Sequence, residues 1–342
     1  MTSLIDHPFW EASEPSDIRL VRLSRILPPE LNPFHNEGVT IQIAGVPGEA
    51  KHSKWIVARS GIYDGVLSGR ITPDTTVIEA TSGNTGEGLA TVCNLLGVPF
   101  LAVMSSDVPQ EKVDAIRIIG RRTGVHLMTD ADETTVEYAR RKGREDGYYN
   151  PDQYANAWNP DAHYTYLAPQ VWKQQPKISI LFPPGGTMGT YIGLARYARD
   201  RGTGTTVIPV VCAEGEEVPG ARTLSSIKKD VRQKWQEYCS EEDFVFGSRH
   251  LSFFLSFLTW SYLVPHLGPS SGLALAGAYQ FLKTHRDAGT LEQFRQDDKK
   301  IRVVVFGPDD NRPYHGLYFG ELKKGELSSK IAPSDLLARL DS

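Results

Sequence analysis

The stretch ITPDTTVIEATSGNTGEGLA, residues 71–90, carries the pattern on which the fold prediction rests. TVIEA (76–80) is a short apolar run of the length of a buried strand. GEGLATVCNLLG (86–97) has apolar residues at helical spacing and ends on a glycine. The residues between them are glycines, hydroxyl side chains and one amide. This stretch therefore predicts a strand, a polar loop and a helix, the repeating unit of a parallel α/β sheet.

The same alternation continues along the chain in both halves. Further strands are predicted at 100–105, 125–130, 178–182, 205–214 and 301–307, and further helices at 111–120, 133–146, 191–200 and 271–285. A polar, aromatic segment at 150–172 interrupts the pattern. The order predicts an α/β fold of two doubly wound subdomains with mostly parallel sheets.

Composition and charge narrow the class of protein. Of the 342 residues, 40% are hydrophobic and 23% charged, the usual balance for a soluble globular protein. A net charge of -4 provides no basic field for nucleic acid or for an anionic membrane surface. Cys93, Cys212 and Cys239 lie far apart without a CxxC pair, which argues against a disulfide framework or a zinc site and suits the cytoplasm. The N-terminal residues carry acidic side chains and no apolar run, so we expect no signal peptide.

The most apolar stretch is LSFFLSFLTWSYLV, residues 251–264. It is shorter than the roughly 18 to 20 residues of a membrane-spanning helix. We expect a buried helix, with a dimer contact or the wall of an apolar channel as alternatives.

Two loops at predicted helix starts have the composition of ligand sites, because helix N-termini offer free N–H groups. Thr81–Gly86 suits a small anion such as a carboxylate, although the same residues also favour an ordinary helix cap. Gly185–Thr190 is a candidate phosphate cradle, but no Gly-Lys-Ser/Thr follows and GxGxxG does not fit in register. A dinucleotide site has an acidic residue at the end of the next strand, and Glu214 stands at that position. NAD binding therefore remains an alternative.

Lys54 is the candidate reactive amine. It stands before the amphipathic run 55–67, and Ser53 could cap that helix. A lysine in the first helical turn faces the positive end of the helix dipole, which favours the neutral amine that imine chemistry needs. The alternative is a solvated surface lysine.

Taken together, these motifs resemble the cysteine synthase and cystathionine β-synthase family of pyridoxal-phosphate enzymes, which have the tryptophan synthase β-subunit fold. The spacing from Lys54 to TSGNTG (81–86) is similar to that of the family. Residues 153–160 with His163 resemble its QFxNPANP…H stretch, residues 186–197 its GTGGTxxGxxRY loop, and residues 268–272 its GxSxG. The resemblance covers roughly residues 40–320.

The resemblance implies a role for each matching residue. Lys54 would form the Schiff base with pyridoxal 5'-phosphate and then act as the base at Cα, and Asn84 would bond the O3′ oxygen of the cofactor. The substrate carboxylate would be held by Thr81, Ser82, Gly83, Thr85 and Gln153. The cofactor phosphate would be held by Gly186, Thr187, Met188, Gly189 and Thr190. Ser270 would meet the pyridine nitrogen, and because a serine is neutral we expect a weak electron sink.

The sequence also departs from the family pattern. Met188 replaces a glycine of the phosphate loop, and Ala157-Trp158 replaces Pro-Ala near Gln153. A basic segment, residues 222–229, stands where a glycine-rich active-site loop is expected. Lining the pocket, it could select an anionic substrate; the alternative is a solvated helix outside the pocket.

We therefore expect a homodimeric, cytoplasmic enzyme that performs β-replacement on an O-activated serine, or on serine, through an aminoacrylate. Its partners would be a small amino acid and a small nucleophile, with no nucleic acid, membrane or metal, and its product could be a nonstandard amino acid. The predicted domains are 40–172, with the Schiff-base lysine, and 1–39 with 173–342, with the phosphate loop. The alternatives are an ammonia-lyase or racemase, a non-catalytic scaffold homologue and an NAD-dependent dehydrogenase.

Overall fold

The computed structural model describes residues 3–12, 18–22, 32–45, 52–81, 83–108, 110–129, 133–261, 267–309, 314 and 316–318. The chain divides into two compact units, Met1–Ser16 with Ser53–Ala162 and Asp17–His52 with His163–Ser342. Their boundaries fall at 16, 52 and 162, whereas the predicted domains change at 39 and 172. Because compactness alone does not show that a range folds by itself, the predicted domains stay a prediction.

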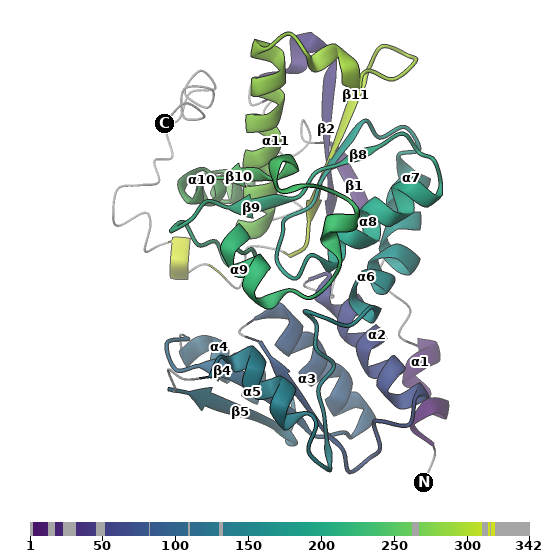
Figure 1. The fold of residues 1–342 in the computed structure, drawn as a ribbon, viewed down its shortest axis with the longest axis vertical. Helices are drawn as coiled ribbons and strands as arrows, with labels where there is room; N and C mark the ends of the chain where they lie inside the picture. The colour runs from purple at the N-terminus through teal and green to yellow at the C-terminus, as the bar shows by residue number, and fades with distance from the viewer. Residues whose placement is uncertain are drawn as a thin grey trace. The chain divides into compact units, whose positions relative to one another are not determined.

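The first unit contains a parallel sheet in the order β5-β4-β3-β6. Figure 1 labels two of its strands, β4 and β5. Its strands are β3 (Thr76–Ala80), β4 (Phe100–Ser105), β5 (Thr123–Met128) and β6 (Tyr148–Tyr149). Its helices are η1 (Leu4–Asp6), α1 (Phe9–Ala12), α2 (Lys54–Leu67), α3 (Asn84–Leu96), α4 (Gln110–Arg117), α5 (Thr135–Lys142) and α6 (Trp158–Ala162). The chain moves from β3 to β5 through α3 and α4 and returns to β6 through α5. Right-handed crossovers therefore place α5 on the opposite face of the sheet from α3 and α4.

The second unit contains a sheet in the order β1-β2-β11-β7-β8, in which only β1 is antiparallel to its neighbour among the described strands. A second, two-stranded sheet is formed by β9 and β10, which pair in parallel. The strands are β1 (Arg19–Arg22), β2 (Val39–Gly45), β7 (Ile180–Phe182), β8 (Thr206–Val207), β9 (Val210–Cys212), β10 (Val245–Gly247) and β11 (Ile301–Gly307). The predicted α/β class with mostly parallel sheets is confirmed.

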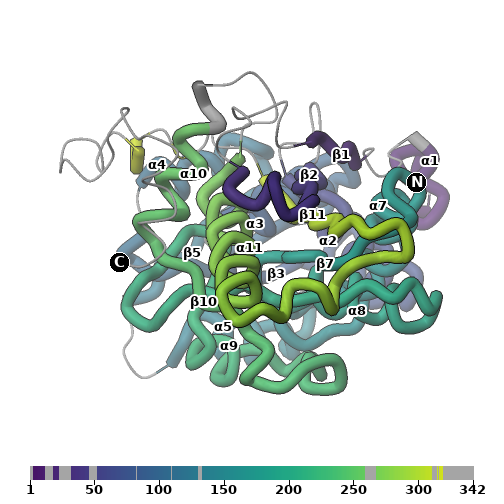
Figure 2. The backbone as a smooth tube through the Cα atoms, turned by 90° about the horizontal axis from the view of Figure 1, so that it is seen from above, coloured from purple at the N-terminus to yellow at the C-terminus, as the bar shows by residue number. Residues whose placement is uncertain are grey.

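The helices of the second unit pack around these strands. They are η4 (His35–Glu37), the π-helix η5 (His163–Leu167), α7 (Ala168–Gln174), α8 (Gly189–Asp200), α9 (Leu224–Asp230), η6 (Trp235–Glu237), η7 (Glu241–Asp243), α10 (Arg249–Ser261), α11 (Pro269–Asp287) and η8 (Leu291–Phe294). Figure 2 shows α11 beside both α10 and β11, consistent with their contacts. The β11 strand is the centre of this unit, because it pairs with β2 along its whole length and with β7 on its other side.

The apolar stretch 251–264 forms α10 as far as Ser261, and residues 262–264 lie outside the described residues. Leu251, Phe253, Phe254 and Leu255 belong to the hydrophobic core of the second unit. The buried-helix prediction is therefore confirmed for these four side chains, whereas Phe257 and Leu258 are partly buried. In the part of the chain that the structure describes, no helix is both long and apolar enough to span a bilayer.

The prediction of one strand over 205–214 is wrong. The segment forms two short strands, β8 and β9, on either side of Pro209. The Ile208 N–H donates to the Leu181 carbonyl and the Val210 N–H donates to the Pro183 carbonyl, so hydrogen bonding to the β7 segment extends past Pro209. From Val210 onward the chain also pairs with β10, on its other side.

Candidate cofactor and substrate site

In the first unit, the predicted carboxylate-binding residues follow two neighbouring strands. Thr81 follows β3, and Gln153 follows β6, which pairs with β3 in parallel. The Thr85 hydroxyl donates a 2.7 Å hydrogen bond to Gln153 Oε1, and Gln153 Nε2 donates a 3.0 Å bond to the Ala80 carbonyl. These bonds bring the TSGNTG loop and the segment after β6 together, as the predicted roles require.

The loop itself is shaped by backbone bonds at the start of α3. Gly86 N–H donates to the Thr81 hydroxyl at 2.9 Å, and a Cβ at Gly86 would lie 2.7 Å from the Thr81 methyl carbon. Gly83 is extended and has open space where a Cβ would stand. Asn84 is the first residue of α3 and is half-buried. Ser82, also predicted to bind the substrate carboxylate, lies outside the described residues.

A buried carboxyl supports this arrangement, and the sequence analysis missed it. Glu79 is 1% exposed, and its Oε2 accepts the Gln153 N–H at 3.2 Å. Burial, reinforced by the charge of Asp152, raises the pKa of Glu79 well above its usual value. The signal in the sequence was an acidic residue inside the apolar strand TVIEA.

Trp158, a departure from the family pattern, is an internal packing residue. Its indole N–H donates to the Pro151 carbonyl at 2.8 Å, and its ring lies 3.0 Å from where a Cβ at Gly61 would stand. Gly61 on α2 is therefore needed to make room for the bulky side chain.

Lys54 is the first residue of α2 and is half-buried. A Cβ at Gly88 would lie 3.1 Å from the Lys54 carbonyl oxygen, so α3 approaches the start of α2 closely through a glycine. The prediction that Ser53 caps this helix is wrong. Ser53 holds the N-cap position, but its backbone is already helical and its hydroxyl makes no capping bond.

In the second unit, the predicted phosphate loop follows β7 and opens α8. Two glycines are required there by close approach: a Cβ at Gly185 would lie 2.7 Å from Val211 Cγ1, and one at Gly186 would lie 2.9 Å from the Gly220 carbonyl oxygen. Met188 is the N-cap of α8 and has a left-handed backbone, with φ at 63°. Thr190 bonds His163 Nε2 at 3.0 Å through its hydroxyl. Thr187, Gly189 and Thr190 are all buried.

Met188 fills a gap rather than facing solvent. It is 2% exposed, and its sulfur lies 3.3 Å from where a Cβ at Gly185 would stand. The family glycine at this position is explained by the positive φ, which a methionine adopts only with strain.

Ser270 lies at the start of α11, beside the end of β11. Its hydroxyl donates to Asp309 Oδ1 at 3.3 Å, and the side chain is 1% exposed. Gly220, with φ at 87°, lies against it, since a Cβ there would stand 3.2 Å from Ser270 Oγ. Gly220 therefore contacts both the phosphate loop and Ser270. Asp309 belongs to none of the motifs recognised in the sequence.

The basic segment 222–229 contains nearly all of α9, and its charges are paired or exposed. Arg222 forms a salt bridge with Asp230, and Lys228 with Glu241. Lys228 and Lys229 are exposed. These contacts favour the solvated-helix interpretation over a pocket lining.

Glu214 also has a local partner. Its carboxylate accepts the N–H and the hydroxyl of Ser225, at 3.1 and 2.8 Å, and these bonds hold its pKa below the usual value. Glu214, whose position was compatible with NAD binding, therefore stabilises the start of α9.

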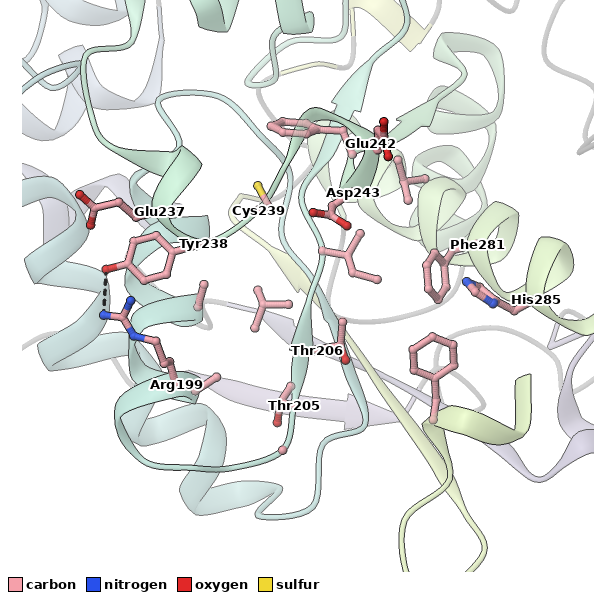
Figure 3. A pocket seen from close by; sticks show the side chains of 18 of the residues that line it. Arg199, Thr205, Thr206, Glu237, Tyr238, Cys239, Glu242, Asp243, Phe281 and His285 are labelled. Atoms are coloured by element: carbon pink, nitrogen blue, oxygen red, sulfur yellow. Dashed lines mark hydrogen bonds between the residues drawn. The ribbon is translucent and has the colours of Figure 1, made fainter. Parts of the chain in front are cut away.

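The second unit contains a cavity of about 790 Å³, formed by the end of α8, β8, the segment 237–245 and the end of α11. Figure 3 shows the side chains that line it. Phe244, Phe281 and Phe294 supply apolar walls, and Asp243 and Arg199 supply charges. None of the predicted site residues lines it.

The sequence profile described as "Pyridoxal-phosphate dependent enzyme" matches residues 53–262. Cysteine synthase B of Escherichia coli (strain K12) is 32% identical over 311 residues, covering 85% of this chain and 93% of the relative. The chain belongs to the pyridoxal-phosphate-dependent enzyme family. Within this family it groups with cysteine synthase and cystathionine β-synthase. Mouse cystathionine β-synthase is 31% identical over 297 residues, which cover 79% of this chain but only 49%, about half, of the mouse protein.

The fold agrees with this family. A crystal structure of cysteine synthase from Entamoeba histolytica superposes with a TM-score of 0.73 at 20% identity, covering 99% of this chain and 95% of that one. The predicted fold type and the predicted cofactor, pyridoxal phosphate, are confirmed at the level of the family.

The described residues fit a bound pyridoxal phosphate. The loop before α8 combines glycines packed too closely for a side chain with two buried threonines, Thr187 and Thr190, at a helix N-terminus, and such a site favours a phosphate dianion. Lys54 provides an amine at a helix start beside the TSGNTG loop. The individual residue roles stay predictions.

Proposed function

We propose that this protein catalyses β-replacement on an O-activated serine, exchanging the β substituent for a small nucleophile. The observation that carries the proposal is the 2.7 Å bond from Thr85 to Gln153, which assembles an uncharged, hydrogen-bonding surface for an amino-acid carboxylate. The α2 helix has Lys54 at its first position and packs against α3. The α3 helix begins at Asn84, within the TSGNTG loop that also contains Thr85.

Each group of residues has a distinct task in this proposal. Thr81, Thr85 and Gln153 bind and orient the substrate carboxylate. Lys54 binds the cofactor through its amine and moves the proton at Cα. The loop from Gly186 to Thr190 binds the phosphate, and Asn84 and Ser270 bind the ring. Pyridoxal phosphate, when bound, supplies the electron sink that makes the β substituent labile.

The test of the cofactor and the lysine is an absorption spectrum of the purified protein. We expect a visible band in the wild type and in Lys51→Ala, and its loss in Lys54→Ala. Lys51, three positions upstream, is the control for removing a lysine. Circular dichroism of each variant checks folding. A wild type that stays colourless with added pyridoxal phosphate would remove the basis of the proposal.

The test of the reaction compares O-acetylserine with O-phosphoserine, with and without added nucleophile. A new amino acid formed only when both substrates are present supports β-replacement. Pyruvate and ammonia released equally well without a nucleophile would instead support the ammonia-lyase alternative. Binding of the cofactor without turnover of either donor would support the non-catalytic homologue.

The nucleophile need not be sulfide. Met188, Trp158 and the 222–229 segment depart from the family pattern, so a product other than cysteine is part of the proposal. A panel of sulfur, nitrogen and carbon nucleophiles with one donor identifies it. Cysteine as the best product by a wide margin would contradict this extension.

We also propose a homodimer in the cytoplasm. The compartment is supported by Cys93, Cys212 and Cys239, all of which are free thiols, as a reducing environment maintains. The proposal of a dimer rests on the family resemblance. Sedimentation velocity tests it, and a species of one chain's mass across the micromolar range would contradict it.

A further inference from the structure

The residue directly before Gln153 has a left-handed backbone. Asp152 has φ at 52°, a conformation that is strained for a residue with a side chain and that persists where surrounding contacts fix it. Its carbonyl accepts the N–H groups of Ala155 and Asn156 at 3.1 and 3.0 Å. The turn closed by these bonds contains Gln153, so the direction of the Gln153 backbone depends on what holds Asp152.

A salt bridge from α5 holds the Asp152 side chain. Arg140 donates from Nε to Asp152 Oδ2 at 2.8 Å and from Nη2 to Oδ1 at 3.1 Å. The two side chains are mostly buried, with 19% of Arg140 and 16% of Asp152 exposed. A two-point bond to a planar guanidinium fixes the orientation of a carboxylate as well as its position. Arg140 therefore opposes any rotation of the strained residue.

A buried carboxyl from β3 holds the next residue of the turn. Glu79 is 1% exposed, and its Oε2 accepts the Gln153 backbone N–H at 3.2 Å. Because burial raises the pKa of Glu79, the folded protein favours its neutral acid form, which still offers an acceptor oxygen. A helix and a strand thus hold the two successive residues of the turn, Arg140 through a side chain and Glu79 through the backbone.

The Gln153 side chain depends on this turn for its place in the site. Its Oε1 accepts the Thr85 hydroxyl and its Nε2 donates to the Ala80 carbonyl, at 2.7 and 3.0 Å. The Gln153 carbonyl accepts a 2.7 Å bond from Asn159 Nδ2. A change of φ at Asp152 would turn the backbone at Gln153 and move the amide away from the TSGNTG loop, where the substrate carboxylate is proposed to bind.

We propose that Arg140 and Glu79 are positioning residues for the substrate, which together hold the left-handed turn at Asp152 so that Gln153 meets the substrate carboxylate. The inference rests on the proposed function, in which Gln153 binds that carboxylate. Arg140 and Glu79 act on substrate binding through Gln153, so their loss should weaken the binding of ligands that carry a carboxylate and spare those that lack one.

The test compares two probes on the holoenzyme: L-serine, which carries the α-carboxylate, and ethanolamine, which is the same amine without it. Titration followed by the absorbance of the bound cofactor gives a Kd for each probe. For Arg140→Met we expect the Kd of L-serine to rise about fivefold and that of ethanolamine to stay constant. Arg141→Met is the matched control, because it removes a two-point salt bridge to Glu133 from the same helix. Both of its Kd values should equal those of the wild type.

Two variants isolate the acceptor role of Glu79. Glu79→Gln keeps a carbonyl oxygen for the Gln153 N–H, so its Kd for L-serine should match that of the wild type. Glu79→Leu removes the acceptor and should raise this Kd at least as much as Arg140→Met does. Asn150→Leu is the control, because Asn150 also joins β3 to the segment after β6, through a 2.7 Å bond to the Ile78 carbonyl that does not involve Gln153.

Several outcomes would overturn the inference. An unchanged Kd for L-serine in Arg140→Met would do so, and this variant gives the answer even where Glu79→Leu does not fold. Equal rises for L-serine and ethanolamine, or equal rises in a variant and its control, would assign the effect to a general disturbance of the first unit. If the wild type binds no cofactor, or binds L-serine no more tightly than ethanolamine, the proposed function and the inference both fail. If it prefers L-serine and the variants keep the same preference, only the inference fails.

Discussion

The Thr85 hydroxyl and the Gln153 side-chain oxygen are joined by a 2.7 Å hydrogen bond across 68 positions of the sequence. The contact exists because β3 and β6 are neighbours in the sheet, so that the segments following them meet. It fixes the positions of the Thr85 and Gln153 side chains relative to each other.

Removing this bond should weaken substrate binding more than turnover. For Thr85→Val we expect KM for the amino-acid donor to rise by up to about tenfold, with a smaller change in kcat, because Gln153 loses a positioning hydrogen bond worth roughly 0.5–1.5 kcal/mol. Thr91→Val is the control on the same helix, since Thr91 donates only to the Glu87 backbone. Steady-state kinetics measure both constants. Equal losses in the two variants would assign the effect to the helix and not to the carboxylate site.

Glu79 should make the stability of the first unit depend on pH. Because burial raises its pKa in the folded state, the folded protein holds a proton that the unfolded chain releases. Stability is therefore lost as pH rises from the unfolded value, near 4.5, toward the raised folded value, by on the order of 1 kcal/mol per pH unit. Glu79→Gln removes this loss, so its melting temperature relative to wild type should increase with pH.

The control for this experiment is Glu111→Gln, which changes an exposed carboxylate on α4. Thermal unfolding at several pH values between 5 and 8 measures the difference between each variant and wild type. A constant offset for Glu79→Gln would mean that Glu79 titrates alike in the folded and unfolded states.

At position 188 the glycine variant should be more stable than the alanine variant, the reverse of the usual order. Both changes lose the burial of its side chain, which for methionine to alanine costs roughly 2–5 kcal/mol. Glycine also relieves the left-handed backbone strain, worth about 1 kcal/mol, so Met188→Gly should be the more stable of the two. Met104, buried in β4, is the control, and there alanine should be more stable than glycine. Denaturant unfolding gives the four values, and the same order at both positions would contradict the argument.

A side chain at Gly220 should disturb Ser270. Gly220→Ala combines a positive φ with a contact of 3.2 Å to Ser270 Oγ, so we expect lower stability together with weaker binding of pyridoxal phosphate. Gly215→Ala has the same kind of φ, 81°, but open space around the new Cβ. It should lose about 1–2 kcal/mol of stability with unchanged cofactor affinity. Cofactor titration followed by absorbance separates the two effects.

Several elements could be predicted from the sequence to the residue. The strands β3, β4 and β11 match their predicted ranges because each is an unbroken apolar or β-branched run between clear turn signals. The helix α3 ends before Gly97, whose left-handed backbone is the expected stop signal. Local pattern fails around Pro209, where the predicted single strand is divided into β8 and β9 and only the second of these pairs with β10.

Some residues of the candidate site could likewise be predicted from the sequence, and others could not. Motif spacing identified Lys54, the TSGNTG loop, Gln153, the phosphate loop and Ser270, because these residues recur in a family. It did not identify Glu79 or Asp309, whose partners lie 74 and 39 positions away. Nor did it decide between a pocket lining and a solvated helix for residues 222–229, since that depends on Asp230 and Glu241 as ion-pair partners.

By itself, the sequence determined the α/β class, the family and the residues that recur in it, because periodicity and motif spacing are local properties of the chain. Only the tertiary structure decided which hydroxyl donates to which acceptor: Thr85 to Gln153, and Ser270 to Asp309. The reason is physical. A hydroxyl can donate in only one direction, and that direction is set by whichever acceptor the fold brings within bonding distance.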